Sequence, residues 1–166
     1  MTGTPEDTLL FVGLSNDVFG FAGVNGAVIN NYFMPGGISF PGSPAVAPWG
    51  TVYVVGSNFN LFALDFAVGG SPLWTYATSG TGTVTAPAVH NSLRAVIYSI
   101  GSSVLCINET GTRVWVWTPP ITPGGVTCST TPAIDSSAPT IWRGAARWPK
   151  PMSPTASIHS GVDAAI

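Results

Sequence analysis

The stretch SPAVAPWGTVYVVGSNFNLFALDFAVGGSPLW, residues 43–74, decides the fold of this 166-residue chain. Short runs rich in Val, Tyr, Phe and Leu alternate within it with turns of Gly, Asn, Ser and Pro. Runs of this length and composition predict β-strands at 43–47, 51–57, 60–66 and 72–78. Apart from a weak pattern in 155–166, no part of the chain has the 3.6-residue apolar spacing of a helix.

The pattern recurs along the chain. A small residue, Pro, Ala and an aliphatic residue follow one another as SPAV (43–46), APAV (86–89) and TPAI (131–134), which contain Pro44, Pro87 and Pro132. An apolar strand repeats at an offset of 43 residues, as DVFGF (17–21), NLFAL (60–64) and SVLCI (103–107). The third unit predicts strands at 83–89, 94–100, 103–108 and 113–118. Four strands repeated every 40–50 residues are typical of a β-propeller, which has one sheet per repeat.

Aromatic residues and glycines mark the same repeat. Tyr53 in TVYVVGS matches Tyr98 in AVIYSIGS, and each unit has a Gly four residues before a Trp: Gly70 and Trp74, then Gly111 and Trp115. A Trp on an outermost strand can bury a large apolar area against the next sheet, and a Gly turn before it lets the chain reverse tightly. We therefore interpret these landmarks as packing residues. In the first unit Asn30 stands at the Trp position.

These motifs resemble the pyrroloquinoline-quinone-like propeller repeat, the family of the quinoprotein alcohol dehydrogenases and the bacterial outer-membrane assembly lipoprotein. The resemblance is carried by SPAV, TVYVVGS (51–57), LFALD (61–65) and the glycine turn before Trp74, and it covers residues 8 to about 142. It implies an all-β propeller of four-stranded antiparallel blades and a location outside the cytoplasm. The first residues show no signal peptide pattern.

The repeat boundaries predict a propeller fragment of about three blades. The units span about 8–42, 43–82 and 83–126, with the start of a fourth at 127–142, and the first lacks its innermost strand. Propellers close with 4–8 blades, so we expect an open stack whose faces and edges favour self-association or poor solubility. The pattern is lost after 142, which predicts a divergent or disordered tail at 143–166.

The low charge and the placement of Gly and Pro argue against nucleic-acid binding and against a transmembrane helix. Charged residues make up 7% of the chain and the formal net charge is −2, so there is no basic patch to bind nucleic acid through its phosphates. Residues 66–93 carry no Asp, Glu, Lys or Arg but are broken by six Gly and Pro residues. These Gly and Pro residues predict turns and exclude a transmembrane helix from this stretch.

Candidate chemical groups are sparse. An enzyme of the quinoprotein kind would need a quinone, a Ca²⁺ site and an aspartate base, but Asp65 and Asp135 are better interpreted as turn-capping residues. Cys106 and Cys128 are 22 residues apart, unlike the adjacent pair of several quinoprotein dehydrogenases, and whether they pair is left open. Asn108 begins a glycosylation sequon on a predicted turn. No residue is assigned as catalytic, cofactor-binding or metal-ligating, and no cofactor is predicted.

The sequence leaves three functional hypotheses. The first is a non-catalytic binding or scaffold module, whose partner is another protein, a surface glycan or a second copy of the chain. The alternative is a fragment of a quinoprotein dehydrogenase whose catalytic blades lie outside this chain, with pyrroloquinoline quinone and calcium as its cofactors. The third is a fragment without independent function.

Overall fold

The computed structural model describes residues 9–67, 72–119, 127 and 130–134. The chain divides into two units, Met1–Ser136 and Ser137–Ile166. The second unit lies outside the described residues, and so do the predicted tail at 143–166 and most of the predicted fourth repeat. All regular structure in the described part is β-strand.

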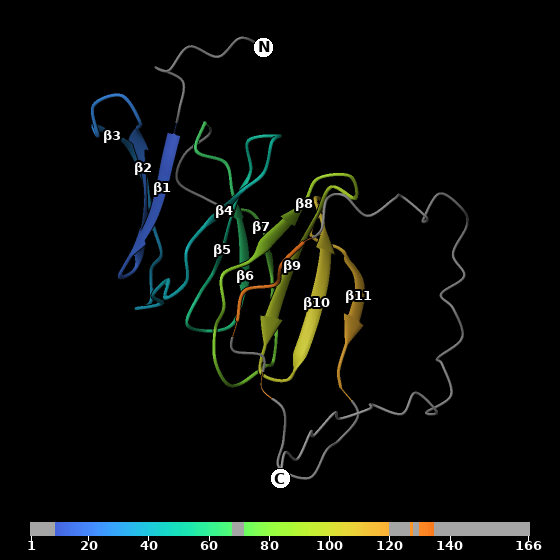
Figure 1. Ribbon diagram of the computed structural model, residues 1–166. Helices are drawn as coiled ribbons and strands as arrows, with labels where there is room; N and C mark the ends of the chain where they lie inside the picture. Colours follow the sequence, from blue (N-terminus) through green and yellow to red (C-terminus); the bar gives the residue numbers. More distant parts are fainter. Residues whose placement is uncertain (1–8, 68–71, 120–126, 128–129, 135–166) are drawn as a thin grey trace, which may run out of the picture. The chain divides into compact units, whose positions relative to one another are not determined.

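The strands form three antiparallel sheets (Figure 1). Sheet 1 has the order β1-β2-β3, with β1 at Leu9–Leu14, β2 at Asp17–Ala22 and β3 at Val28–Phe33. Sheet 2 has the order β4-β5-β6-β7, with strands at Ala45–Val46, Val52–Val55, Leu61–Leu64 and Pro72–Tyr76. Sheet 3 consists of β8 to β11, at Ala88–His90, Ala95–Ile100, Ser103–Asn108 and Arg113–Trp117.

The predicted fold class is confirmed: the chain is all-β, with one antiparallel sheet per repeat and three strands in the first. Several strands are shorter than predicted, most of all those at 43–47 and 83–89. Only Ala45–Val46 of the first is strand, only the end of the second belongs to β8, and Val84 makes a single bridge to Ile100. Residues 131–134, the third copy of the Pro-Ala motif, belong to no strand.

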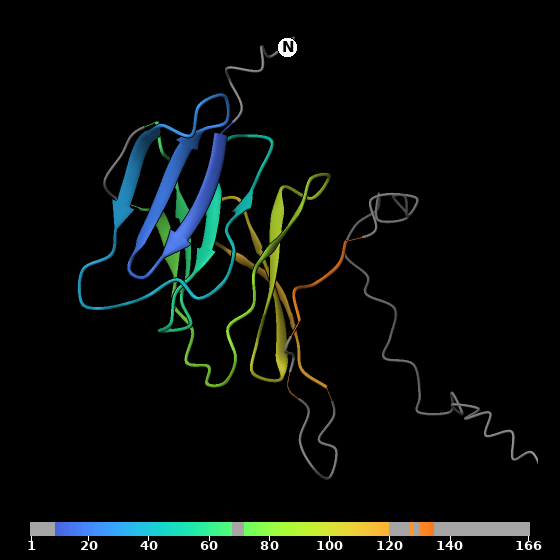
Figure 2. The same ribbon diagram turned by 60° about the vertical axis from the view of Figure 1, so that its left-hand side comes forward.

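Sheet 2 is covered on both faces. Its Val52, Val54, Phe62 and Leu64 pack with Val18, Tyr32 and Phe40 in a cluster shared with sheet 1, and Figure 2 shows sheet 1 in front of sheet 2. Alternate residues of the same two strands enter a second cluster. Because both faces are buried, β5 and β6 are unbroken apolar runs, VYVV and LFAL.

The second cluster joins sheets 2 and 3. Sheet 2 contributes Tyr53, Val55, Leu61 and Ala63, and sheet 3 contributes Val96, Tyr98, Ile100, Leu105 and Ile107. Tyr53 and Tyr98 are both fully buried and are the largest such side chains in the described residues. The innermost strands of the two sheets, β4 and β8, also contact one another. The three sheets therefore stack in chain order, with sheet 2 in the middle.

Strand register corrects one of the sequence correspondences. Tyr53 pairs with Ala63 and Ala45, whereas the residue that pairs with the equivalent Cys106 and Ala88 is Ile97. Ile97, and not Tyr98, is therefore the counterpart of Tyr53. From Ile97 to its partner Cys106 the chain advances 9 residues, against 10 from Tyr53 to Ala63. This shift of one residue turns a side chain to the opposite face. The two tyrosines thus face each other across one interface.

Candidate functional site

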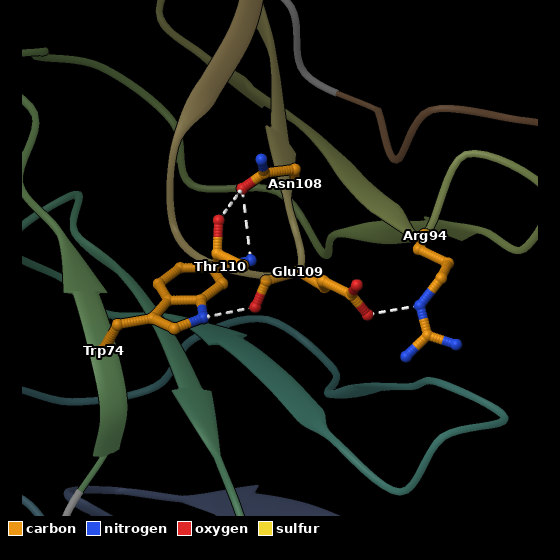
Figure 3. A network of polar contacts seen from close by, with 5 residues as sticks. All are labelled: Trp74, Arg94, Asn108, Glu109 and Thr110. Carbon is orange, nitrogen blue, oxygen red and sulfur yellow. Dashed lines mark hydrogen bonds and ion pairs between the residues drawn. The ribbon is translucent and has the colours of Figure 1, made fainter.

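The junction between sheets 2 and 3 is built around Trp74 (Figure 3). The Trp74 indole N–H donates a 2.8 Å hydrogen bond to the backbone carbonyl of Glu109, in the turn between β10 and β11. The ring also packs 5.8 Å from that of Tyr53, centroid to centroid. Trp74 therefore connects the outermost strand of one sheet to a turn of the next.

Gly111 makes this contact possible. Its φ is +83°, a left-handed conformation that favours glycine. A Cβ added there would lie 2.9 Å from Trp74 Cδ2, closer than a side chain tolerates. The two landmarks that meet thus come from neighbouring repeats, because Gly111 belongs to the unit after that of Trp74.

The junction between sheets 1 and 2 is also joined by a side-chain hydrogen bond, with a different residue at the position of Trp74. Asn30, Trp74 and Trp115 are equivalent by register, since they pair with Gly20, Ala63 and Cys106, which are spaced by 43 residues. The Asn30 side-chain amide donates a 3.2 Å hydrogen bond to the carbonyl of Phe66. Phe66 stands 43 residues before Glu109. The departure from the Trp pattern therefore preserves the hydrogen bond between sheets while the large ring is lost.

The accepting carbonyls lie in turns closed by a side chain. The Asp65 carboxylate accepts a 2.8 Å hydrogen bond from the Ala67 N–H, which confirms its turn-capping role. The Asn108 side-chain oxygen accepts hydrogen bonds from the Thr110 N–H, the Thr110 hydroxyl and the Thr112 N–H, at 2.8–3.1 Å. The predicted sequon thus lies in the turn that holds Glu109 for Trp74.

An ionic contact borders the same junction. Arg94 and Glu109 form an ion pair, and the Arg94 guanidinium lies 4.8 Å from the ring centroid of Trp49, a cation–π arrangement. Both charged side chains are partly exposed. Sequence reasoning missed Trp49 and Arg94, although Trp49 stands in the turn directly before the TVYVVGS strand.

The buried tyrosines of this junction have no hydrogen-bond partner within the described residues. The hydroxyls of Tyr53 and Tyr98 and the indole N–H of Trp49 are all buried without one. Burial raises the pKa of both tyrosines. For Tyr53, the nearby Trp49 and Thr51 side chains lower the pKa in part, although neither completes a hydrogen bond of acceptable geometry. Both phenols remain neutral and act as packing groups.

A different surface is free for a partner. By register, the face of sheet 1 turned away from sheet 2 carries the apolar residues Val12, Leu14, Phe19, Phe21, Val28 and Phe33, together with the hydrogen-bonded polar pair of Asp17 and Asn31. Val12 is 40% exposed, Leu14 53%, Phe33 56% and Val28 57%. We call the six apolar residues the open face. An apolar surface of this kind marks an interaction site.

A small cavity lies beside the open face, at the free edge of β1. It has a volume of about 220 Å³ and is lined by residues 11–13 of β1 and residues 40–44 of the following connection. Small-molecule sites are larger, typically about 300–1,000 Å³. The cavity is of a size for a few residues of extended chain.

The remaining predicted residues are placed as follows. Pro44 and Pro87 directly precede the innermost strands β4 and β8, which suits a residue without an N–H. Cys106 is a free, fully buried thiol on β10, and Trp115 is half-buried on β11. Pro132 lies in the strandless segment 130–134. Gly70, Cys128 and Asp135 lie outside the described residues.

Within the described ranges, no group of three or more His, Cys, Asp and Glu side chains is arranged to hold a metal ion. Nor do these ranges contain a helix of the length and apolarity needed to cross a membrane.

Comparison with known proteins supports the architecture. No protein-family model matches the chain, and no curated protein matches it. Among solved structures, BamB from Moraxella catarrhalis is similar with a TM-score of 0.56 and 19% identity, over 66% of this chain and 33% of BamB. A protein of unknown function from Bacteroides caccae is similar with a TM-score of 0.54 and 17% identity, over 65% of this chain and 39% of that protein.

The matched region spans between one third and two fifths of those two proteins. BamB is a β-propeller protein, and likeness at this level of identity shows the fold alone. Together with the three stacked antiparallel sheets, it establishes that this chain has the fold of a partial β-propeller.

Proposed function

We propose that the chain is a non-catalytic propeller module that serves as a binding or scaffold surface for a protein partner. The observation that carries this proposal is the open face of sheet 1. Six apolar side chains lie there, four of them exposed and Phe19 and Phe21 half-buried, in a protein whose charged fraction is 7%. An apolar face of this kind favours a protein over a charged or nucleic-acid ligand.

The sequence landmarks support the same proposal. Tyr53, Tyr98 and Trp74 are engaged in packing sheet 2 against sheet 3, with Gly111 against the Trp74 ring, so these three aromatic rings are not available as a stacking platform for a quinone. The resemblance to the pyrroloquinoline-quinone-like repeat adds a location outside the cytoplasm to the proposal. Fractionation of the source cells tests that location.

Two measurements test the proposed function. The first is titration with pyrroloquinoline quinone and Ca²⁺, followed by tryptophan fluorescence. We expect no saturable change, and saturable binding would favour the quinoprotein alternative and overturn the proposal.

The second measurement is cross-linking in the cells that make the protein, followed by mass spectrometry. We expect protein adducts, a second copy included, that are lost in Val12→Lys. Val24→Lys is the matched control, because Val24 is 60% exposed and lies in the β2–β3 turn and not in a strand of sheet 1. Adducts that persist in Val12→Lys would refute the role of the open face.

A further inference from the structure

One sheet of the described structure has a strand fewer than the others. Sheets 2 and 3 each have four strands, and their innermost strands, β4 and β8, are formed by the end of the Pro-Ala motif. Sheet 1 has three strands, and in the described residues no strand pairs with the outer edge of β1. An unpaired edge of this kind is a template for another strand.

The chain also carries a copy of the motif that no sheet uses. Residues 131–134, TPAI, repeat the sequence that forms β4 and β8, but they belong to no strand. Figure 1 shows the segment 130–134 alongside sheet 3. It follows sheet 3 in the chain as β8 follows sheet 2, so it is positioned to begin the next sheet of the stack.

The missing and the spare strand match in register. Ala45 pairs with Tyr53, and Ala88 pairs with Ile97. The residue of β1 at the same place is Phe11, because it pairs with Gly20, the counterpart of Ala63 and Cys106. Ala133 would therefore lie opposite Phe11, and Ile134 opposite Leu10.

The backbone N–H and C=O groups that could pair with a further strand point toward the outer edge of β1. The β1–β2 hairpin closes on the pair Leu14 and Asp17 with a two-residue turn, so hydrogen-bonded pairs recur at every second residue from there. Phe11 falls on an intervening position, and its N–H and C=O face the outer edge of β1. The cavity lined by residues 11–13 and 40–44 lies beside this edge.

The β1 that receives the spare strand must belong to another molecule. Within one chain, sheet 2 separates sheet 1 from sheet 3, since each of the two packs on a different face of sheet 2. A second copy placed after sheet 3 would bring its own open face to the stack. The receiving face of sheet 3 carries Trp117, which lies on the same side as Cys106 by register and is 53% exposed.

We propose that two copies of this chain close into one six-bladed ring, in which residues 131–134 of each copy form the innermost strand of sheet 1 of the other. Twice the three sheets of the described residues gives six, which lies inside the range of 4–8 blades of closed propellers, whereas three copies would exceed it. The ring covers the open face of each copy and leaves no free β1 edge. This inference rests on the proposed function and names its partner as a second copy.

The first test measures mass by sedimentation equilibrium and perturbs the donor strand. The 166-residue chain should sediment at twice 17.1 kDa. Ala133→Pro removes the N–H that would bind the Phe11 carbonyl at both junctions, so the dissociation constant should rise roughly tenfold or more. Residue 133 lies in no strand, so the fold of the monomer is not at risk. Thr131→Ala is the matched control, since the corresponding position of the third unit is Ala86.

The second test perturbs the receiving surface and then combines the variants. Val12→Lys places a charge on the open face and should weaken the dimer, and Val24→Lys should not. In a mixture of Ala133→Pro with Val12→Lys, the mixed dimer regains one intact junction. Because independent losses of binding free energy add, the dissociation constant of the mixed dimer should lie between those of the two variants with themselves.

Three results would overturn the ring. These are a monomer at all concentrations, a series of species larger than the dimer, and a dimer that Ala133→Pro leaves unchanged. Circular dichroism of each variant verifies folding. In cells, adducts to other proteins only would overturn the ring and leave the proposed function intact, whereas quinone binding would overturn the proposed function whatever the mass.

Discussion

Replacement of Gly111 by Ala tests how the sheets are joined. Two features of the structure oppose a side chain at this position. The backbone φ of +83° lies in the left-handed region, and the new Cβ would lie 2.9 Å from Trp74 Cδ2 and 3.0 Å from Cγ. The indole ring cannot easily retreat, because Trp74 is held by its hydrogen bond to Glu109 and by contact with Tyr53.

The two costs can be separated. A left-handed conformation costs an L-residue about 1–2 kcal/mol, and a Cβ forced into a packed site costs typically about 1–3 kcal/mol more. Gly36 provides the control, since its φ is +86° and no atom lies within 4 Å of an added Cβ. Gly36→Ala should therefore lower the free energy of unfolding by about 1–2 kcal/mol, and Gly111→Ala by about 2–5 kcal/mol.

Urea unfolding followed by tryptophan fluorescence measures both values. We expect Gly111→Ala to be more destabilising than Gly36→Ala by at least about 1 kcal/mol. In a Trp74→Ala background the added Cβ meets empty space, so the excess should largely disappear. Equal losses for the two glycine variants would refute the argument that Gly111 is required by close contact with the neighbouring sheet.

Three further predictions concern the same interfaces. Trp74→Phe and Asn30→Ala each remove one hydrogen bond between sheets and should each cost about 1 kcal/mol of unfolding free energy in urea; no loss in either would contradict the equivalence of the two junctions. Burial raises the pKa of the Cys106 thiol to about 11. The folded chain therefore holds a proton that the unfolded chain releases above about pH 9, so the stability that this thiol contributes is lost as pH rises from about 9 to 11. The Tm of the wild-type chain should fall more steeply over this range than that of Cys106→Ala, whose counterpart in sheet 2 is Ala63, and parallel curves would refute it. Glu109→Gln breaks a partly exposed ion pair and should cost less than about 1 kcal/mol by urea unfolding, with a larger loss showing that the pair does more than a surface contact.

The sheets could be predicted from the sequence because their strands are local. Each hairpin joins strands that are consecutive in the chain, so the alternation of apolar runs and turns in residues 43–74 specifies a whole sheet. The missing strand of the first unit was visible for the same reason, as the absence of a Pro-Ala motif before β1. The two innermost strands are the exceptions, since only Ala45 and Val46 of the strand predicted at 43–47, and Ala88 and Val89 of the strand predicted at 83–89, pair along a strand.

The contacts between sheets were harder to predict from the sequence. The match of Tyr53 with Tyr98 followed the similarity of the two sequences and was wrong, because the span between equivalent paired positions is one residue shorter in sheet 3 and turns the second tyrosine to the other face. Asn30 was recognised only as a departure from the Trp pattern. Its role became evident from the carbonyl of Phe66, which lies 36 residues away.

The sequence by itself determined the fold class and the number and order of the sheets, and it indicated which unit lacks a strand. These features depend on hydrophobic periodicity and turn residues, which act within about 43 residues. The tertiary structure alone decided which face each side chain occupies, that Gly111 meets Trp74 of the preceding repeat, and that Val12, Leu14, Val28 and Phe33 are exposed. Those features depend on register and on the packing of one sheet against the next, where a shift of a single residue exchanges the buried face for the open one.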